Sequence, residues 1–515
     1  MDELVRPWNI LLLLALVSCG SHPQKAPSAA TPAASSFRLR DFRFKSGLRV
    51  VGEEDTTSPI VGVVNVVGAG SASDPPGKEG LAHLVEHLTF RAKRENRTTW
   101  SLFQQAGAGL SSGTTYHDST VFYEFGPRDA LLDLLVLEAS RMTDPLVGID
   151  EQVFNVEREV VRNELRQRGE TVVDGTVWAE LSKAVYPEIH PYSRPIIGTH
   201  ESLNRLTLAD AREFAKRTYR PANMTMVVTG DFPLDRLDKF VTQAFPASLG
   251  DPTRDAKAGE SRMALQSAEP PAPPPSKGIV TIEGMVTAPE LHLAWSLPPS
   301  YGSTSHLARI AEGGLYGAIE HAEDHDSDVI GGSADLIPGV QSSMVLARVI
   351  LREGSHPERS AEFVLNGLME NWLNGTNLRA HQVWFERVIA RAATTMLFES
   401  EDISERAIER ANFAHFTGDL GYVGHRLDAV GALNPSQLET FYSQYLNRDR
   451  ARIVLVRPIP SERQGTFAHV GIGESKDSSA PVQYDIASLR KLAVSPSLNR
   501  LFRSRTLKNG LYVEA

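Results

Sequence analysis

The residues best suited to chemistry lie together in one short segment, His83-Leu84-Val85-Glu86-His87. On a helix, positions i and i+4 lie one above the other, so His83 and His87 can place two imidazoles on one metal ion. Glu86 shares that face closely enough to hold a water on the ion. Zinc lowers the pKa of such a water to about 7, and a neighbouring carboxylate can take the proton and pass it to a leaving amine. The pattern therefore predicts a hydrolytic zinc site.

A catalytic zinc takes three protein ligands and keeps one open position. The chain has one cysteine, so any metal must be held by histidine, aspartate or glutamate. The candidates for the third ligand are Glu157, Glu159 and Glu164, which recur on a helical pattern. Glu157 and Glu164 are two turns apart and therefore share a face. Spacing alone does not choose among the three glutamates.

The elements that must position these residues mix strands with helices. A β-branched run over residues 60–67 and an apolar segment over 120–125 predict strands. Amphipathic patterns predict helices over the following segments: 80–93, 98–105, 131–142 and 151–167. Because no regular βαβ alternation is present, we expect an α+β fold, an antiparallel-rich sheet with helices packed on one face.

The chain contains two blocks that resemble copies of one unit. A proline-rich linker at residues 250–277 separates a zinc-binding catalytic domain, residues 37–249, from a second homologous domain without metal, residues 278–458. Each block ends with a helix-like stretch followed by an apolar strand. Two residue pairs correspond at one offset of 226 residues: Tyr219 with Tyr445, and Val228 with Val454. A shared offset favours duplication over coincidence.

The C-terminal segment hints at a further copy. After a polar linker at residues 459–500, the sequence Arg505 to Val513 repeats the pattern of Asp41 to Val50, an apolar run that meets a Lys-x-Gly turn and resumes. This is typical of a hairpin. We expect residues 501–515 to begin a further repeat, and the chain to be the front half of a longer protein. The alternative is a chance match of a common turn.

The N-terminus indicates export. An apolar run follows Arg6 and is too short to span a bilayer, which is typical of a signal peptide over residues 1–19. It ends in Leu-Val-Ser-Cys19-Gly, which resembles the lipobox of bacterial lipoproteins. We expect lipidation at Cys19, a flexible tether over residues 20–36, and an outer-membrane anchor facing the periplasm. The alternative is an ordinary secretory signal with an incidental cysteine.

The charge balance excludes nucleic acid as a partner. Across 515 residues, 53 lysines and arginines face 63 aspartates and glutamates, which gives a formal net charge of −10. No long basic block is present. Phosphate binding needs a concentrated positive face, which this chain lacks.

Taken together, the motif and its surroundings resemble the pitrilysin family, which includes insulysin and the mitochondrial processing peptidases. The resemblance rests on the HxxEH segment, on a glutamate 77 residues after its second histidine, and on flanking motifs. Those flanking motifs are Gly68-Ala69-Gly70-Ser71, Gly80-Leu81-Ala82, Phe90, Thr120 to Tyr123, Glu157-Arg158 to Glu164-Leu165, His190-Pro191 to Gly198, and Asn223 to Gly230. It covers residues 37–458 and is strongest in the first block.

The resemblance implies a role for each site residue. His83, His87 and Glu164 would bind one Zn²⁺ per chain, Glu86 would be the general base, and Glu157 would orient the site. Thr120 would lie on the strand that aligns substrate by adding a peptide to a sheet edge.

The sequence departs from the family pattern at two places near the motif. Ser112-Gly113 stand where the family's substrate strand has an Asn-Ala pair. Arg91-Ala92-Lys93 replace a Lys-Gly-Thr-like continuation. The departures concern substrate alignment more than zinc binding.

Active members of the family also clamp the substrate carbonyl with an arginine and a tyrosine from a later domain. The segment from Glu320 to Gly332 contains no such pair, and its His/Asp run is typical of a solvated acidic loop. The clamp would then come from a second half or a partner subunit.

The expected function is a zinc-dependent metalloendopeptidase that cleaves peptides or unfolded polypeptides. The alternative is a non-catalytic scaffold or peptide-binding subunit of the same fold. Glu86 and Glu164 are both intact and favour the enzyme, because a scaffold has no need for a carboxylate beside a metal-bound water.

Overall fold

The computed structural model describes residues 37–94, 96–167, 173–245, 252–253, 269–373, 378–459, 505–506 and 512–513. They fall into two compact units, one ending at Pro458 and one beginning at Ile459. The signal peptide, Cys19, the tether and most of both predicted linkers lie outside the described residues. Among the helices that the structure describes, none combines the length and apolar character needed to cross a bilayer.

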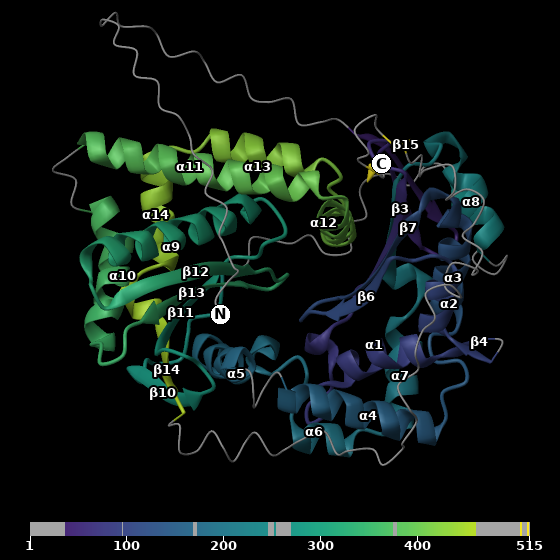
Figure 1. Cartoon of the computed structure of the whole chain (residues 1–515), viewed down its shortest axis with the longest axis horizontal. Coiled ribbons are helices and arrows are strands. Elements are labelled where there is room, and N and C mark those ends of the chain that lie inside the picture. Colours follow the sequence, from purple (N-terminus) through teal and green to yellow (C-terminus); the bar gives the residue numbers. More distant parts are fainter. Residues whose placement is uncertain are drawn as a thin grey trace, which may run out of the picture. The chain divides into compact units, whose positions relative to one another are not determined.

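The first domain of the larger unit is built on a seven-stranded sheet in the order β6-β7-β3-β8-β2-β1-β9 (Figure 1). Its pairs are antiparallel except for β2 with β8. Its strands are β1 (Arg38–Phe44), β2 (Arg49–Glu54), β3 (Ile60–Val67), β6 (Leu110–Thr115), β7 (Thr120–Pro127), β8 (Met224–Gly230) and β9 (Pro252–Thr253), with a separate short pair β4 (Lys93–Arg94) and β5 (Arg97–Thr98). Its helices are α1 (Leu81–Arg91), α2 (Thr99–Gln105), α3 (Leu131–Thr143), α4 (Glu151–Leu165), α5 (Val173–Val185), α6 (His200–Arg205), α7 (Leu208–Thr218) and α8 (Leu237–Ala244).

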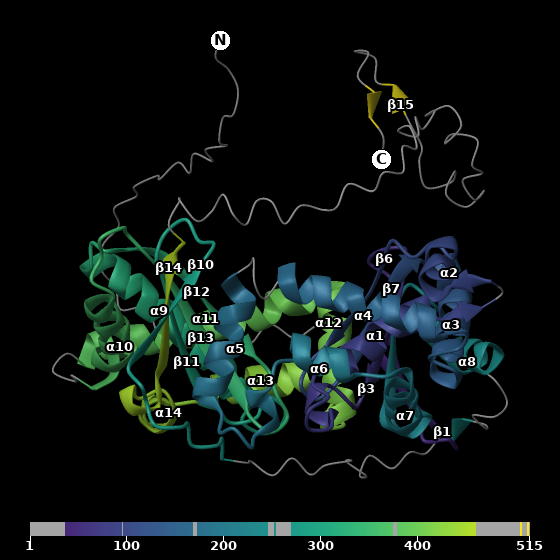
Figure 2. The ribbon, with the colours of Figure 1, turned by 90° about the horizontal axis from the view of Figure 1, so that it is seen from below.

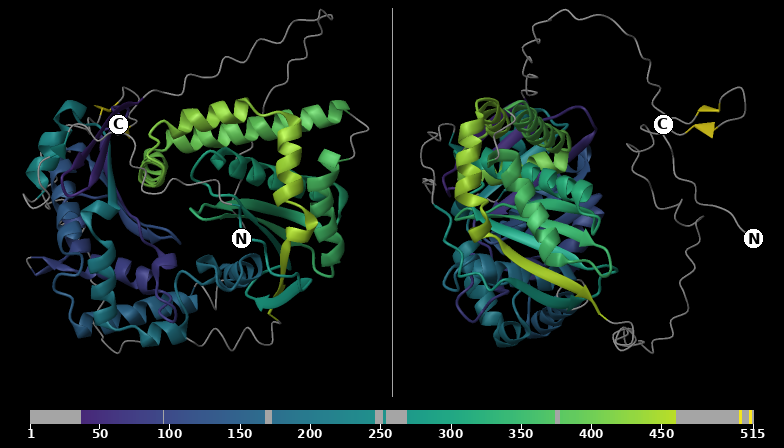
Figure 3. Two further views of the ribbon diagram at one scale, coloured as in Figure 1. Left: turned by 180° about the vertical axis from the view of Figure 1, so that it is seen from behind. Right: turned by 90° about the vertical axis from the view of Figure 1, so that its left-hand side faces the viewer.

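The second domain has a five-stranded sheet in the order β10-β14-β11-β13-β12. Its strands are β10 (Ile279–Gly284), β11 (Glu290–Leu297), β12 (Val329–Ile337), β13 (Ser343–Leu351) and β14 (Arg452–Pro458). Its helices are α9 (Ser305–His325), α10 (Pro357–Leu373), α11 (Leu378–Glu401), α12 (Ile403–Phe416), α13 (Tyr422–Gly431) and α14 (Pro435–Tyr445). Strand β14, yellow in Figure 3, comes last in the unit yet lies between β10 and β11.

The two domains repeat one strand order, as the duplicated sequence pattern predicts. Five strands of the first sheet, β6-β7-β3-β8-β2, correspond in order to β12-β13-β11-β14-β10 of the second. Within these five strands of each sheet, the last in the sequence (β8 or β14) pairs parallel with the first (β2 or β10) and antiparallel with the second (β3 or β11). The predicted fold class, α+β with antiparallel-rich sheets, is confirmed.

Each sheet is covered on its second face by a helix from the other domain. Strand side chains alternate between faces, so Val61 and Val63 of β3 join the core under the first domain's own helices, whereas Val64 and Val66 pack against α12. The second sheet is covered in the same way by α5, which packs on β14 and β11 through Val177, Leu181 and Val185. The prediction that helices cover one face of each sheet is correct for the helices of the same domain. It did not include α5 and α12, each of which covers the second face of the other domain's sheet.

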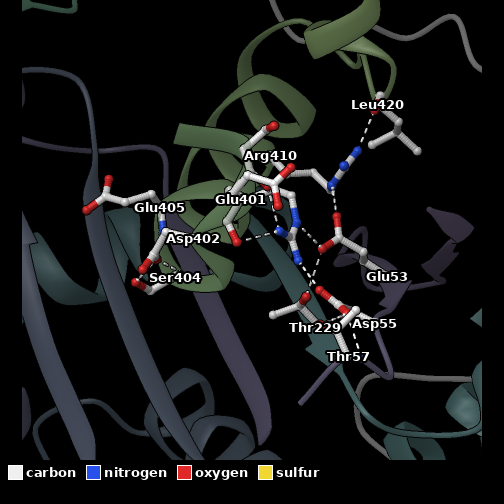
Figure 4. Close-up of polar contacts among 12 residues, drawn as sticks. Glu53, Asp55, Thr57, Thr229, Glu401, Asp402, Ser404, Glu405, Arg410 and Leu420 are labelled. Carbon is white, nitrogen blue, oxygen red and sulfur yellow. Dashed lines mark hydrogen bonds and ion pairs between the residues drawn. The ribbon is translucent and has the colours of Figure 1, made fainter. Parts of the chain in front are cut away.

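Buried charges fix α12 on the first sheet (Figure 4). Glu53 of β2 accepts from Arg406 Nε at 2.8 Å, from Arg410 Nε at 2.5 Å and from the Thr229 hydroxyl at 2.9 Å. Arg406 also pairs with Asp55. The side chains of Glu53, Arg406 and Arg410 are at most 5% exposed. A buried charge is tolerated when it is paired and hydrogen-bonded, as here.

The predicted acidic loop around Glu320 to Gly332 is wrong. His321 and His325 lie in the last turns of α9, and β12 begins at Val329. Asp326 is 2% exposed and binds Arg359 at 2.7 Å and Ser360 Oγ at 2.7 Å. The acidic residues between the histidines and the strand therefore close the end of the helix onto α10.

In the second unit, β15 (Arg505–Thr506) pairs antiparallel with β16 (Tyr512–Val513), as the hairpin pattern predicts. Arg505 faces Val513 there, as Phe42 faces Val50 in the β1–β2 hairpin. That residues 501–515 begin a further repeat stays a prediction.

Candidate active site

Helix α1 is held at its start by a buried carboxylate. Asp74 accepts hydrogen bonds from the backbone N–H of Gly80 and of Ala82, both at 2.9 Å. These are amides that the first turn of a helix leaves without intrahelical partners. Gly80 has φ +92° and its Cα lies against the Ile197 carbonyl, where a Cβ would clash at 2.5 Å. A glycine is therefore required where the chain enters the helix.

The three motif residues lie together on one side of α1. The ring centroids of His83 and His87 are 4.7 Å apart, and the ligand atoms of His83, Glu86 and His87 lie within 4.8 Å of one another. Across the described residues, no other group of three histidine, cysteine or acidic side chains meets that criterion. The helical placement predicted from the spacing is what brings them together.

Helix α4 lies beside α1 and decides among the three candidate glutamates (Figure 2). Glu164 Oε2 lies 3.2 Å from His87 Nε2 and 3.9 Å from His83 Nε2. Glu157 contacts the other ring nitrogen of His87, with Oε1 at 3.1 Å from Nδ1. Glu159 points away, with a side chain 48% exposed and paired to Arg162. The structure therefore groups His83, His87 and Glu164, with Glu157 behind His87.

Glu86 is buried and oriented from the neighbouring strand β6. Its Oε2 accepts a hydrogen bond from Thr115 Oγ1 at 2.6 Å, and only 6% of the residue is exposed. Gly113 faces the same carboxylate, and a Cβ there would lie 3.0 Å from Glu86 Oε1 and 3.1 Å from Phe90. Strand residues i and i+2 share a face, so Gly113 and Thr115 together form the wall against Glu86. Sequence reasoning missed Thr115, which this alternation along β6 would have indicated.

The surroundings set the protonation of the site. Burial raises the pKa of Glu86 above its ordinary value, although the Thr115 hydrogen bond opposes the shift. Burial alone would lower the pKa of His87, but hydrogen bonds with Glu157 and Glu164 outweigh it and raise that pKa to about 9. Burial favours the neutral form of Glu157, yet His87 and Arg91 together hold its pKa below the ordinary value.

The substrate-strand residues divide between two strands. Ser112 and Gly113 lie on β6, the edge of the first sheet, so its outer backbone groups are open to an added strand. Thr120 was predicted on the edge strand, and this is wrong. It lies on β7, between β6 and β3, is fully buried, and its hydroxyl donates to Ala69 O at 2.9 Å.

The motif opens into a cavity of about 1200 Å³. Its walls include Phe90, Arg91 and Trp100 beside the motif, β6 residues 112–115, and residues of α4 and α5. Phe90 and Trp100 meet edge to face, with ring centroids 5.8 Å apart. The cavity is large enough to receive a peptide segment, and it places apolar and cationic groups next to Glu86.

The donor set fits a zinc ion. Two imidazole Nε2 atoms from α1 and one carboxylate oxygen from α4 converge on one point. Histidine nitrogen and carboxylate oxygen are the ligand types of catalytic zinc sites. His87 also has the carboxylate partner at Nδ1 that metal-binding histidines commonly have. His83, His87 and Glu164 would hold the ion, and Glu86 stands beside it.

Comparison with known proteins identifies peptidase families and relatives along the chain. The family described as Insulinase (Peptidase family M16) matches residues 49–200, and the family described as Peptidase M16 inactive domain matches residues 205–312. A probable mitochondrial-processing peptidase subunit beta from Schizosaccharomyces pombe is 28% identical over 204 residues, 39% of this chain and 43% of that protein. An uncharacterized zinc protease from Mycobacterium leprae is 30% identical over 224 residues, 43% of this chain and 49% of that protein. The chain thus spans less than half the length of these curated relatives.

The fold has solved counterparts as well. The crystal structure of a protease from Helicobacter pylori superposes with a TM-score of 0.68 at 20% identity, over 82% of this chain and 100% of that chain. The matched families, the zinc-protease relatives and the convergent ligand set agree on one assignment. The chain belongs to the M16 family of peptidases, the family of insulinase and pitrilysin.

Proposed function

We propose that the chain is a zinc-dependent metalloendopeptidase in which Glu86 is the general base. The observation that carries the proposal is the meeting of His83, His87 and Glu164 beside a buried, hydrogen-bonded Glu86. A scaffold needs none of this arrangement. The substrates would be peptides or unfolded polypeptides, because an added strand on β6 requires an extended chain.

In the proposed reaction, each residue around the motif would have a separate role. When bound, zinc polarises the scissile carbonyl and supplies a water of lowered pKa. Glu86 would accept a proton from the attacking water and deliver it to the leaving amine. Thr115 holds the Glu86 carboxylate in one orientation, and Glu157 holds the ring of His87. The backbone of β6 aligns the peptide beside Glu86.

The test is cleavage of unstructured peptides, followed by mass spectrometry, by the chain and its Glu86→Gln variant, each purified together with any subunit that accompanies it. The wild type should cleave, lose activity to a chelator and regain it with zinc. Glu86→Gln should retain zinc and lose at least about 100-fold in rate, the range expected for a general base. Cleavage by Glu86→Gln at the wild-type rate would overturn the proposal. A zinc-loaded wild type that cleaves nothing, alone or with a co-purified subunit, would favour the scaffold alternative.

We also propose that the active assembly includes a second family-like half. The S. pombe relative is named as one subunit of a processing peptidase, and the Glu320 to Gly332 segment supplies no arginine and tyrosine pair. Such a half, as a subunit or a continuation of the chain, would provide the carbonyl clamp. Size-exclusion chromatography of the protein from its native cells tests this, since a chain that runs alone and cleaves at full rate contradicts it.

We propose further that the protein is exported and anchored to the outer membrane by a lipid on Cys19, facing the periplasm. The support is the sequence Leu16-Val17-Ser18-Cys19 after a short apolar run. A Cys19→Ser variant should move from the membrane fraction to the soluble fraction, and an unchanged distribution would contradict the anchor.

A further inference from the structure

The guanidinium of Arg91 has N–H donors that form no hydrogen bond with the described residues of the site. Its Nε donates to Glu157 Oε2 at 2.6 Å, and within the described residues this is the only hydrogen bond of the guanidinium. The side chain is 49% exposed and lines the cavity beside the motif. A guanidinium has five N–H donors, so the two terminal nitrogens retain four of them.

Among the described residues, Glu157 is the one acidic side chain within ion-pair distance of Arg91. Lys183, another cation on the cavity wall, pairs with Glu180 at 3.0 Å. The Glu157 side chain is 4% exposed and binds Arg91 Nε, which fixes one edge of the guanidinium. Fixing one edge lowers the entropy lost when the other edge binds a ligand.

The position of Arg91 places it near the reacting bond. Arg91 follows His87 by one turn of α1, which is about 6 Å along the helix axis at 1.5 Å per residue. An extended peptide advances about 3.3 Å per residue. For a peptide that runs along the α1 axis past His87, the side chain nearest Arg91 would therefore belong to a residue about two positions from the scissile bond.

We propose that Arg91 is a specificity-determining residue that selects peptides carrying a carboxylate about two residues from the cleaved bond. This inference rests on the proposed function. The ligand would be an aspartate or glutamate side chain, bound in bidentate fashion by the terminal nitrogens, a geometry that arginine provides and lysine does not.

The experiment compares peptides that are identical except for glutamate or glutamine at one position. Each of the three positions on either side of the cleaved bond is varied in turn, and kcat/KM is measured with the zinc-loaded full-length chain. At one position the wild type should prefer the glutamate peptide by about tenfold, which corresponds to about 1.4 kcal/mol. Arg91→Gln should bring that ratio close to one, Arg91→Lys should leave part of it, and Arg91→Glu should favour a lysine peptide.

The ratio separates selection from a purely structural role. If Arg91 serves only to orient Glu157, its variants lower both rates together and leave the ratio unchanged. Lys183→Gln is the matched control, since it removes one positive charge from the same cavity and should keep the wild-type ratio. The inference is overturned if the wild type shows no preference at any position, or if the preference survives in Arg91→Gln. Failure to cleave any peptide, by the chain alone and with any co-purified subunit, would overturn the proposed function itself, and this inference with it.

Discussion

At the scale of single residues, the orientation of Glu86 depends on one hydroxyl. Thr115 Oγ1 lies 2.6 Å from the carboxylate, and its donation opposes the effect of burial on the pKa of Glu86. A general base must be held at the proton it takes, and misplacement lowers the rate without lowering affinity for the metal.

We therefore expect Thr115→Val to reduce kcat by about tenfold while zinc content stays at the wild-type level, and Thr115→Ser to restore most of the activity. The measurement is peptide cleavage with parallel elemental analysis. Thr440→Val is the control, because Thr440 lies on α14 of the second domain, where its hydroxyl donates to Ser436 O. A wild-type rate in Thr115→Val would show that Glu86 needs no help from β6.

A second residue-scale prediction concerns the space at Gly113. An added Cβ would lie 3.0 Å from Glu86 Oε1 and 3.1 Å from Phe90. Gly113→Ala should therefore displace either the base or the edge strand and lower kcat/KM by about tenfold or more, because catalysis is sensitive to shifts of about 1 Å. Gly109→Ala, where nothing lies within 4 Å of the added Cβ, is the control and should cleave normally.

The zinc motif itself could be predicted from the sequence, because a helix converts the spacing of His83, Glu86 and His87 directly into proximity. The third ligand could not be chosen by spacing. Glu157 and Glu164 share a face of α4, and only the packing of α4 against α1 puts one beside His87 Nε2 and the other beside Nδ1. Thr115 and Arg91 were missed because their partners, Glu86 and Glu157, lie 29 and 66 residues away.

At the scale of elements, α12 depends on a buried charge for its place on the first sheet. Glu53 holds both Arg406 and Arg410, and the side chains of all three are at most 5% exposed. Removing one partner of such a group leaves uncompensated buried charge, which costs about 3 to 5 kcal/mol.

Glu53→Gln should accordingly lower the free energy of unfolding by about 3 kcal/mol or more, measured by urea denaturation. The control is Glu362→Gln, which breaks the ion pair between Glu362 and Arg448 at the surface. The side chain of Glu362 is 50% exposed and that of Arg448 is 47% exposed. An exposed pair contributes at most about 1 kcal/mol. Equal losses in the two variants would contradict the anchoring role of Glu53.

The turn between β6 and β7 contains a titratable group buried at the contact between the domains. His117 stacks on Tyr192 at 4.4 Å, and its Nδ1 lies 2.9 Å from Ser71 Oγ. Burial, aided by the charges of His190 and Arg194, lowers the pKa of His117 to about 3.

In the folded state His117 stays neutral down to about pH 3, whereas in the unfolded state it takes up a proton near pH 6.5. The neutral, buried His117 therefore contributes its full stabilisation of the fold above about pH 6.5. This stabilisation is lost as the pH falls toward 3, at up to about 1.4 kcal/mol per pH unit. Thermal unfolding at pH 7 and pH 5 should show this loss in the wild type and a smaller one in His117→Gln. The His356→Gln control, at an exposed histidine, should follow the wild type. An unchanged slope in His117→Gln would contradict the assignment.

Local patterns predicted many of the elements well. The β-branched run at residues 60–67 is β3, and the amphipathic segment at 151–167 contains α4. Burial on both faces of β3 shows why the run is uninterrupted, since α12 covers the face that its own domain leaves open. The exchange of α5 and α12 could not be predicted, because periodicity tells which face of a helix is apolar and not which domain receives it.

In the whole molecule, the two copies of the duplicated unit differ in role: the first contains the candidate active site, and the second packs against the sheet of the first. Both domains have the same strand order, yet among the described residues the group of side chains that could hold a metal ion lies in the first domain. The second domain contributes α12 to the outer face of the first sheet, and β7, the neighbour of edge strand β6, is among the strands that α12 contacts. The second domain thus supports the sheet from which substrate would be aligned.

In the proposed zinc site, α1 supplies two histidines and α4 supplies Glu164 as the third ligand. The most direct measurement is the zinc content per chain of the full-length protein after passage over a mild chelator, beside Glu164→Gln and Glu159→Gln. Both variants remove one carboxylate from α4, but only Glu164 faces the histidines. We predict about one zinc per chain in the wild type and in Glu159→Gln, and little in Glu164→Gln. Wild-type zinc content in Glu164→Gln, or loss of zinc in Glu159→Gln, would show that Glu164 is not the third ligand.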